Sequence, residues 1–521
     1  MCDALFTFPL NRLNLLKLPE QKAEKKIKIA VYRNHSFEMT AGILNVFLRF
    51  SGLEASFDYS DYDDSLNFRT IEADLHLIWV DIERYKTSDI AAFLKERAET
   101  LSAKTQKPVL LAYTGRSVDL SLTAADCFSF RVDDWLAELG DQAYDEAKEA
   151  YSGTRLSNKA VLEAARVLGL KYIPAFFKTP LKAVVLDLDN TLYKGILGED
   201  GVDALIPDNA LQSEIKKLKK DGFFLCLCSK NEEEDVRKMF EKRTDFVLKM
   251  EDFTAVQINW QSKADNILKL AKTLNIGTDA MLFIDDNPAE IENVRPTGVK
   301  TLLAKENIAR VVSYYPGLMK LRSSAEDALR AKDVQANAAR MELAKTLSRE
   351  EYFQKLGIKL VYSVNDETQI PRVAELFGKT NQFILGYKRY KETDVRSFMR
   401  DNGKCVITIH MSDSLSDSGI IAILAAHAEN GVLTVDELTV SCRALGRNLE
   451  DVMLPELFRL AQRHLNAKKQ MEIPYLKGER NMPALKWLAA LTGTETDERG
   501  TAVYEIPEHV DLSGLTVEVR E

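Results

Sequence analysis

Short apolar runs alternate with amphipathic helical patterns along residues 182–304, and this alternation restricts the possible folds more than any other feature of the sequence. Strands that alternate with helices favour a parallel sheet with helices packed on both faces. In such open sheets, ligands bind beyond the carboxyl ends of the strands. The sequence predicts strands at 182–187, 223–229, 246–250, 280–286 and 300–304, and helices at 210–221, 232–242, 261–274 and 288–295.

Two regions with patterns of their own flank this one. Towards the N-terminus, apolar runs at 27–33, 73–80 and 107–113 alternate with helical stretches, which predicts a small doubly wound α/β domain that ends in a polar helical stretch at 131–170. Towards the C-terminus, closely spaced strands and helices predict an α+β unit. We expect an N-terminal extension at 1–26, an α/β domain at 27–170, a second α/β domain at 171–318, a linker helix at 319–350 and an α+β domain at 351–521.

The composition excludes several classes of protein. Of the 521 residues, 45% are hydrophobic, which argues against a disordered chain. The 79 Asp and Glu outnumber the 70 Lys and Arg, so nothing indicates binding to nucleic acid. Neither the six cysteines nor the six histidines show the spacing of a disulfide framework or a zinc site. No apolar run reaches the roughly 18 residues of a membrane span, and we expect a cytoplasmic protein without membrane partners.

The segment VVLDLDNTLYKG at 184–195 carries the strongest chemical signal. Asp187 and Asp189 stand two residues apart at the carboxyl end of an apolar strand. Burying two carboxylates there is costly unless a cation offsets their charge. Mg²⁺ prefers hard oxygen ligands and keeps positions for water and phosphate, so the segment predicts a magnesium site.

Three further strand ends carry residues that suit the same site. Ser229 ends one predicted strand and is followed by Lys230 and Asn231, where a hydroxyl and backbone N–H groups can hold phosphate oxygens. Lys263 begins a predicted helix and can neutralise phosphate charge, and a third strand ends in Asp285 and Asp286. The alternative interpretation is that these residues are only polar caps on strand ends.

These four motifs, in this order, resemble those of the haloacid dehalogenase (HAD) superfamily. The resemblance implies that Asp187 attacks phosphorus and forms a phosphoaspartate, while Asp189 acts as general acid and then as general base. It also implies that Mg²⁺ is held by Asp187, the backbone carbonyl of Asp189 and Asp286, with Asp285 as a supporting acid. Further residues expected to bind phosphate or substrate are Asn190, Thr191, Lys230, Asn231, Trp260 and Asn287.

Longer segments resemble the FkbH-like proteins, a branch of the HAD type III subfamily. These segments are DLDNTLYKGILGEDG, CSKN, NWQSKADNI, FIDDNPAE, GKTNQF and SCRALGR. The resemblance implies a Rossmann-like HAD core flanked by an N-terminal flavodoxin-like or SGNH-like domain and a C-terminal acetyltransferase-like (GNAT-like) domain. It further implies that the enzyme removes phosphate from 1,3-bisphosphoglycerate and loads the glyceryl group on an acyl carrier protein. The sequence departs from this family at Tyr193-Lys194, where Trp-Gly is usual, and at SDSGIIAIL.

The C-terminal region has a weaker signal of its own. Arg443, Gly446 and Asn448 resemble the acetyltransferase loop whose backbone N–H groups hold a pyrophosphate at a helix N-terminus. Cys442 precedes this loop and is a candidate acyl-thioester carrier, or else a buried packing residue. Residues 378–382 fit either a helix-capping turn or a contact with phosphopantetheine.

The residues leave three functions open. The first is an FkbH-like enzyme with Mg²⁺, a small phosphorylated substrate and an acyl carrier protein as partner. The second is a plain phosphohydrolase that acts on a sugar phosphate or a phosphorylated acid in surface-polysaccharide or secondary metabolism. The third is a non-catalytic binding module, against which the intact acidic and basic motif residues argue.

Overall fold

The computed structural model describes residues 3–62, 66–69, 71–87, 89–124, 126–321, 336, 340, 343, 347–441, 443–445, 447 and 449–521. The chain forms two compact units. The first contains Met1–Asp252, Ile258–Lys263 and Asp279–Ser323, and the second contains the remaining residues. Most of the linker helix expected at 319–350 lies outside the described residues. Residues 319–321 are not helical, and a separate helix, α14 (Arg349–Leu356), begins at the N-cap Ser348. Within the described residues, no helix is long and apolar enough to cross a membrane.

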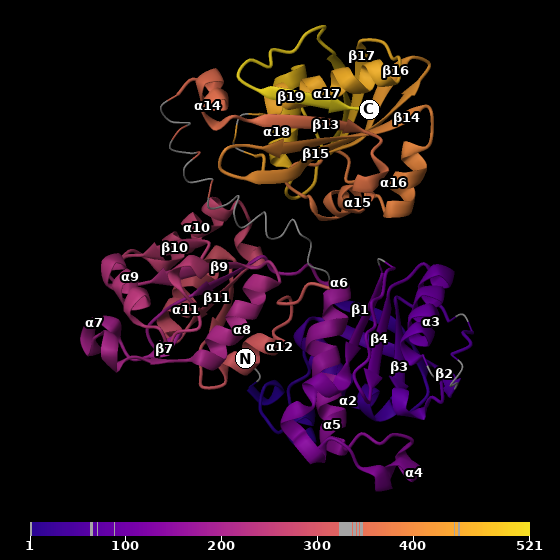
Figure 1. Ribbon diagram of the computed structural model, residues 1–521, viewed down its shortest axis with the longest axis vertical. Coiled ribbons are helices and arrows are strands. Elements are labelled where there is room, and N and C mark those ends of the chain that lie inside the picture. Colours follow the sequence, from indigo (N-terminus) through magenta and orange to yellow (C-terminus); the bar gives the residue numbers. More distant parts are fainter. Residues whose placement is uncertain are drawn as a thin grey trace. The chain divides into compact units, whose positions relative to one another are not determined.

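The N-terminal part of the first unit is a five-stranded parallel sheet in the order β2-β1-β3-β4-β5. Helix α3 (Ile90–Thr105) packs its apolar side on one face, while α2 (Glu38–Phe50) and α5 (Asn158–Val167) lie on the other (Figure 1). Its other helices are α1 (Arg12–Leu16), α4 (Glu149–Ser152) and α6 (Ile173–Phe177). The strands are β1 (Lys25–Arg33), β2 (Leu53–Tyr62), β3 (Leu75–Asp81), β4 (Val109–Thr114) and β5 (Cys127–Arg131).

The prediction of a helical stretch at 131–170 is wrong for the first half of this range. Short 3-10 turns occupy that half, and Gly140 interrupts them with a φ of 50° that a helix does not contain. After the four-residue α4, the long helix of this stretch begins at α5, where the Ser157 side chain accepts a hydrogen bond from the backbone N–H of Ala160.

Another five-stranded sheet has the strand order β10-β9-β6-β11-β12. The pairs β6–β9, β6–β11 and β11–β12 are parallel, as the alternating pattern predicts. Its strands are β6 (Ala183–Leu186), β9 (Phe224–Ser229), β10 (Ala255–Ile258), β11 (Met281–Asp285) and β12 (Lys300–Leu303). Its helices are α8 (Asn209–Lys220), α9 (Glu233–Lys242), α10 (Lys263–Leu274), α11 (Pro288–Val294) and α12 (Ile308–Tyr314).

One strand predicted in this region is wrong. Residues 246–250 do not pair with the sheet, and the strand at its edge is instead β10. Phe246 packs its ring against Tyr193 and Phe240, and the side chain of Gln212 accepts the backbone N–H of Leu248. The segment is therefore buried by side-chain packing, and a side chain takes the place of a neighbouring strand as a backbone partner.

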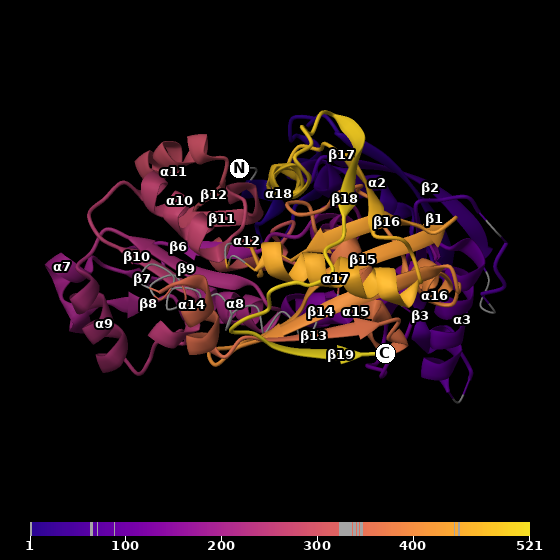
Figure 2. The ribbon, with the colours of Figure 1, turned by 90° about the horizontal axis from the view of Figure 1, so that it is seen from above.

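The C-terminal part of the chain is a seven-stranded mixed sheet in the order β18-β17-β16-β15-β14-β13-β19. Helices α17 (Glu450–His464) and α18 (Met482–Thr492) pack on one face, while α15 (Ile370–Lys379) and α16 (Glu392–Met399) pack on the other (Figure 2). The strands are β13 (Lys359–Val364), β14 (Lys404–Ser412), β15 (Asp417–Glu429), β16 (Val432–Val440), β17 (Gln470–Leu476), β18 (Arg499–Glu505) and β19 (Thr516–Arg520). The predicted fold class, an α/β protein with parallel-sheet cores, is confirmed.

Candidate active site

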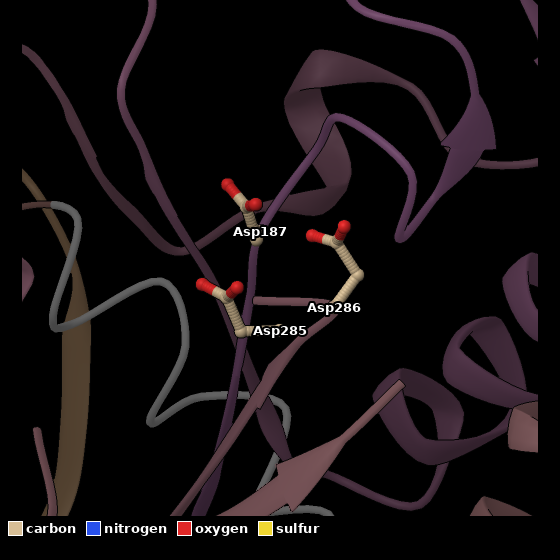
Figure 3. Close-up of side chains that lie close together, drawn as sticks. All are labelled: Asp187, Asp285 and Asp286. Carbon is tan, nitrogen blue, oxygen red and sulfur yellow. The ribbon is translucent and has the colours of Figure 1, made fainter. Parts of the chain in front are cut away.

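Three carboxylates meet at the carboxyl ends of two neighbouring strands. Asp187 follows β6, Asp285 ends β11 and Asp286 comes next, and one oxygen from each lies within 4.8 Å of the other two (Figure 3). The strands β6 and β11 are parallel and paired, so their carboxyl ends lie at the same edge of the sheet. Asp187 is 5% exposed and Asp285 is fully buried. The geometry brings together residues that the sequence separates by about a hundred positions.

Lys263 supplies the positive charge of this cluster. Its Nζ lies 3.0 Å from Oδ1 of Asp187 and 2.6 Å from Oδ2 of Asp285. Burial alone would lower the pKa of Lys263, but the two carboxylates outweigh burial and raise the pKa to about 12. Lys263 therefore stays charged and links the ends of β6 and β11.

The carboxylates carry more negative charge than Lys263 offsets. Burial raises the pKa of Asp187, and Lys263 and the Ser229 hydroxyl oppose this rise. Burial also raises the pKa of Asp285, and the pKa of Asp286 is raised by burial and then by the nearby charge of Asp187. A hard divalent cation prefers oxygen ligands and would offset the repulsion between these three carboxylates. The residues present therefore fit a divalent cation.

Asp189 is held at both of its carboxylate oxygens. Its Oδ1 accepts hydrogen bonds from the Tyr193 hydroxyl at 2.7 Å and from the Leu197 N–H at 3.0 Å. Its Oδ2 accepts one from Nδ2 of Asn231 at 2.9 Å, and the same Nδ2 lies 3.2 Å from Oγ of Ser229. Asn231 thus connects two of the motifs that the sequence placed at separate strand ends.

Tyr193 is a residue that sequence reasoning missed as a member of the site. In the sequence Tyr193 stands out only as a departure from a family pattern, and the three residues between it and Asp189 follow no helix or strand period. Burial, followed by the charge and hydrogen bond of Asp189, raises the pKa of Tyr193. The hydroxyl therefore keeps its proton and remains a donor.

The other predicted phosphate or substrate residues take varied places. The Asn190 side chain accepts a hydrogen bond from the backbone N–H of Gly195 in the turn after Asp189. Asn287 is the N-cap of α11, and its backbone N–H donates to the Asp285 carboxylate at 2.8 Å. Lys230 pairs with Glu290 at 2.5 Å. Trp260 is 67% exposed and its indole N–H donates to Glu232 at 2.6 Å, so it lies at the surface.

Thr191 is the one member of this group whose side chain is buried with an unsatisfied polar atom. It is 3% exposed, and its Oγ1 makes no hydrogen bond to any residue that the structure describes. A buried hydroxyl in this condition is costly unless it finds a partner.

The C-terminal candidates are only partly described. Cys442, Gly446 and Asn448 lie outside the described residues. Arg443 is 5% exposed, and its guanidinium donates to the backbone carbonyl of Ile420 at 3.3 Å.

Residues 378–382 make the contacts of a capping turn. Arg389 donates to the carbonyl of Thr380 at 2.8 Å and to Oδ1 of Asn381 at 2.7 Å, and the N–H of Thr380 bonds to Leu376. The bonds to Thr380 and Leu376 satisfy backbone carbonyls at the end of α15, and the bond to Asn381 holds its side chain.

Comparison with known proteins finds only distant similarity. The sequence matches no protein-family model and no curated protein. One similar structure is the N-terminal part of BF1531 from Bacteroides fragilis, which contains a phosphatase domain and is complexed with Mg. The two chains have 21% sequence identity and a TM-score of 0.43, and the match covers 62% of this chain and 99% of that chain. Another is a HAD-family enzyme from Bacteroides thetaiotaomicron complexed with magnesium and inorganic phosphate, with 14% identity, a TM-score of 0.20, and coverage of 24% and 94%.

A third similar structure is an acetyltransferase. It is the ribosomal-protein-S18-alanine N-acetyltransferase from Escherichia coli, with 13% identity, a TM-score of 0.22, and coverage of 29% of this chain and 97% of that chain. Similarities this low do not assign an activity, so the function is inferred from the geometry of the site.

Proposed function

We propose that this protein is a Mg²⁺-dependent phosphatase of the HAD type, which acts on a small phosphorylated substrate through a phosphoaspartate on Asp187. The observation that carries the proposal is the cluster in which Lys263 bridges Asp187 and Asp285 at the ends of two paired parallel strands, with Asp286 beside them. Asp189 stands two residues beyond Asp187 and is oriented by three donors. Residues 171–318 form the proposed catalytic domain.

Asp187, Asp286 and the backbone carbonyl of Asp189 would hold the magnesium ion, with Asp285 supporting Lys263. When bound, Mg²⁺ offsets the repulsion between the carboxylates and the incoming phosphate. Lys263 adds a fixed positive charge next to Asp187. Ser229 and the backbone N–H groups that follow it would hold phosphate oxygens.

The chemistry then proceeds in two displacements. A carboxylate oxygen of Asp187 forms a bond to phosphorus, the bond from phosphorus to the leaving oxygen breaks, and Asp189 gives that oxygen a proton. In the second step, water attacks phosphorus, Asp189 takes a proton from the water, and the bond between Asp187 and phosphorus breaks. Phosphate leaves, and both aspartates return to their starting states.

The chain near this site supports an open entrance. Between Asp187 and Ser229 the chain forms the small hairpin of β7 (Tyr193–Lys194) and β8 (Ile206–Pro207), the short α7 (Leu197–Asp200) and α8, and no folded cap domain. Such a site accepts a bulky substrate or one presented by a larger partner.

We further propose, from the FkbH-like segments, that the substrate is a phosphorylated three-carbon acyl donor and that the glyceryl group passes to an acyl carrier protein. In this scheme a thiolate attacks the acyl carbon of the donor, the bond from that carbon to the phosphate oxygen breaks, and phosphate leaves; Cys442 is the candidate thiol. Asp187 would hydrolyse the phosphate ester at the other end of the donor, because attack on the phosphorus of the acyl phosphate would release a free acid that forms no thioester. Hydrolysis of a sugar phosphate or phosphorylated acid without acyl transfer is the alternative.

Phosphate release tests the phosphatase proposal directly. The purified protein is incubated with Mg²⁺ and p-nitrophenyl phosphate, alongside Asp187→Asn and a matched control, Asp89→Asn, at the N-cap of α3. We expect Asp187→Asn to lose the activity and Asp89→Asn to keep it. Equal rates in wild type and Asp187→Asn would contradict the mechanism.

Intact-mass measurement tests the acyl transfer separately. The protein, Mg²⁺, fresh 1,3-bisphosphoglycerate and a holo acyl carrier protein are mixed, with an enzyme-free control because this acyl phosphate hydrolyses spontaneously. A glyceryl mass on the carrier supports the transfer. Enzyme-dependent phosphate release without that mass supports the plain phosphatase.

A further inference from the structure

Tyr193 lies against the carboxylate that the proposed mechanism uses as acid and base. It belongs to β7, is 1% exposed, and donates its hydroxyl proton to Oδ1 of Asp189 at 2.7 Å. Its ring packs edge-on against Phe246, and its backbone pairs with Pro207 of β8. Tyr193 is therefore fixed from the ring and from the backbone, so its hydroxyl has one position.

The donors around Asp189 are unequally divided between its two oxygens. Oδ1 accepts from Tyr193 and from the Leu197 N–H, while Oδ2 accepts from Asn231 alone among the bonds described. Each oxygen of a carboxylate offers two lone-pair positions. Oδ1 is thus filled and Oδ2 keeps one position, on the side where Asn231 also contacts Ser229.

We infer that Tyr193 is a positioning residue that reserves Oδ2 of Asp189 as the oxygen that exchanges the proton with the leaving group and with water. This inference rests on the proposed phosphatase function. Without the Tyr193 hydroxyl, each oxygen accepts from one donor, Leu197 at Oδ1 and Asn231 at Oδ2, so the donors no longer distinguish Oδ2 from Oδ1 as the oxygen presented for the transfer. Proton transfer would suffer, whereas the attack of Asp187 and the binding of phosphate would not.

Because Tyr193 would affect proton transfer by Asp189 and not the attack by Asp187, its removal should affect substrates according to their leaving groups. An alkoxide is a poor leaving group and needs a proton as the bond to phosphorus breaks, whereas p-nitrophenolate leaves without one. Loss of correct proton transfer should therefore slow alkyl phosphates and spare aryl phosphates. A general loss of folding or of substrate binding would slow both alike.

The experiment compares glycerol 2-phosphate with p-nitrophenyl phosphate in wild type and Tyr193→Phe. We expect kcat/KM for the alkyl ester to fall about tenfold or more, and kcat/KM for the aryl ester to change by less than about twofold. Both values are measured on one preparation, so their ratio does not depend on the fraction of folded enzyme. Tyr32→Phe is the matched control, because this buried tyrosine also bonds through its hydroxyl but lies in the N-terminal sheet.

The outcomes separate this inference from the function on which it rests. A change in the substrate ratio for Tyr193→Phe, with none for Tyr32→Phe, supports the positioning role. An unchanged ratio overturns it, whether or not the overall rate falls, while the phosphatase proposal stands as long as Asp187→Asn is inactive. Absence of any Asp187-dependent hydrolysis in wild type overturns both.

Discussion

The Nζ atom of Lys263 lies 3.0 Å from Oδ1 of Asp187, which joins the start of α10 to the end of β6 through one buried ion pair. The same ammonium group contacts Asp285 at 2.6 Å. A single cation therefore faces two buried carboxylates, and a third, Asp286, adds to the negative charge. Stability and chemistry at this site depend on the same groups.

Replacing Lys263 by Met is expected to abolish activity and to destabilise the metal-free protein. The change leaves Asp187 and Asp285 buried without their cation, which costs about 3–5 kcal/mol for a broken buried pair. Thermal unfolding followed by circular dichroism measures the loss. Lys305→Met, which removes an exposed partner of Asp3, is the control and should leave the melting temperature nearly unchanged. An equally small change in both variants would contradict the role given to Lys263.

Replacing Asp286 by Asn is expected to have opposite effects without and with Mg²⁺. Removing one of three clustered charges relieves repulsion, so the metal-free variant should melt at a higher temperature than wild type. A ligand that binds only the folded state raises the free energy of unfolding, and this increase grows with the logarithm of the ligand concentration divided by Kd. Titration of MgCl₂ should therefore raise the melting temperature of wild type and have little effect on the variant. A full magnesium response in Asp286→Asn would exclude it as a ligand.

His35 is expected to make the protein less stable as the pH falls below about 6.5. Burial lowers the pKa of His35 to about 3, whereas the unfolded chain has the ordinary value near 6.5. Between these values the unfolded state binds the extra proton, so acid favours unfolding by about 3 kcal/mol at pH 4. Denaturant unfolding at pH 7 and pH 4 measures this difference.

Two variants separate the His35 contribution from other acid effects. His35→Gln should lose less stability between pH 7 and pH 4 than wild type does, although His76, whose pKa burial lowers to about 4, still contributes. His464 is exposed, so His464→Gln should follow wild type. If His35→Gln followed wild type as well, His35 would not be the titrating group.

Glu437 is expected to be essential for the stability of the C-terminal part of the chain. Its buried carboxylate accepts the backbone N–H groups of Leu385 at 3.0 Å, Gly386 at 2.9 Å and Lys388 at 2.7 Å. Glu437→Ala removes the acceptor of the Gly386 and Lys388 N–H groups and one of the two acceptors of the Leu385 N–H, which also bonds to the Leu438 carbonyl. Losing these hydrogen bonds to a charged group costs about 3 kcal/mol. Urea unfolding should show the loss, and Glu472→Ala, at an exposed site on β17, should show almost none. Similar midpoints for the two variants would contradict this account.

Much of the candidate site could be predicted from the sequence because its residues follow apolar strands. Asp187, Ser229 and Asp285 each end or follow a run whose period and length indicate a buried strand, and parallel neighbouring strands end at one edge. The same local reasoning failed at 246–250, which is apolar enough for a strand but is buried against side chains.

What the sequence by itself determined about this protein is the local pattern: alternating strands and helices, and acidic or hydroxyl residues at the strand ends. These follow from periodicity, which needs only near neighbours in the chain. Only the tertiary structure decided that Lys263 sits between Asp187 and Asp285, and that Tyr193 and Asn231 hold opposite oxygens of Asp189. Such contacts depend on strand order and on the path of irregular loops, which bring together side chains that no period in the sequence relates.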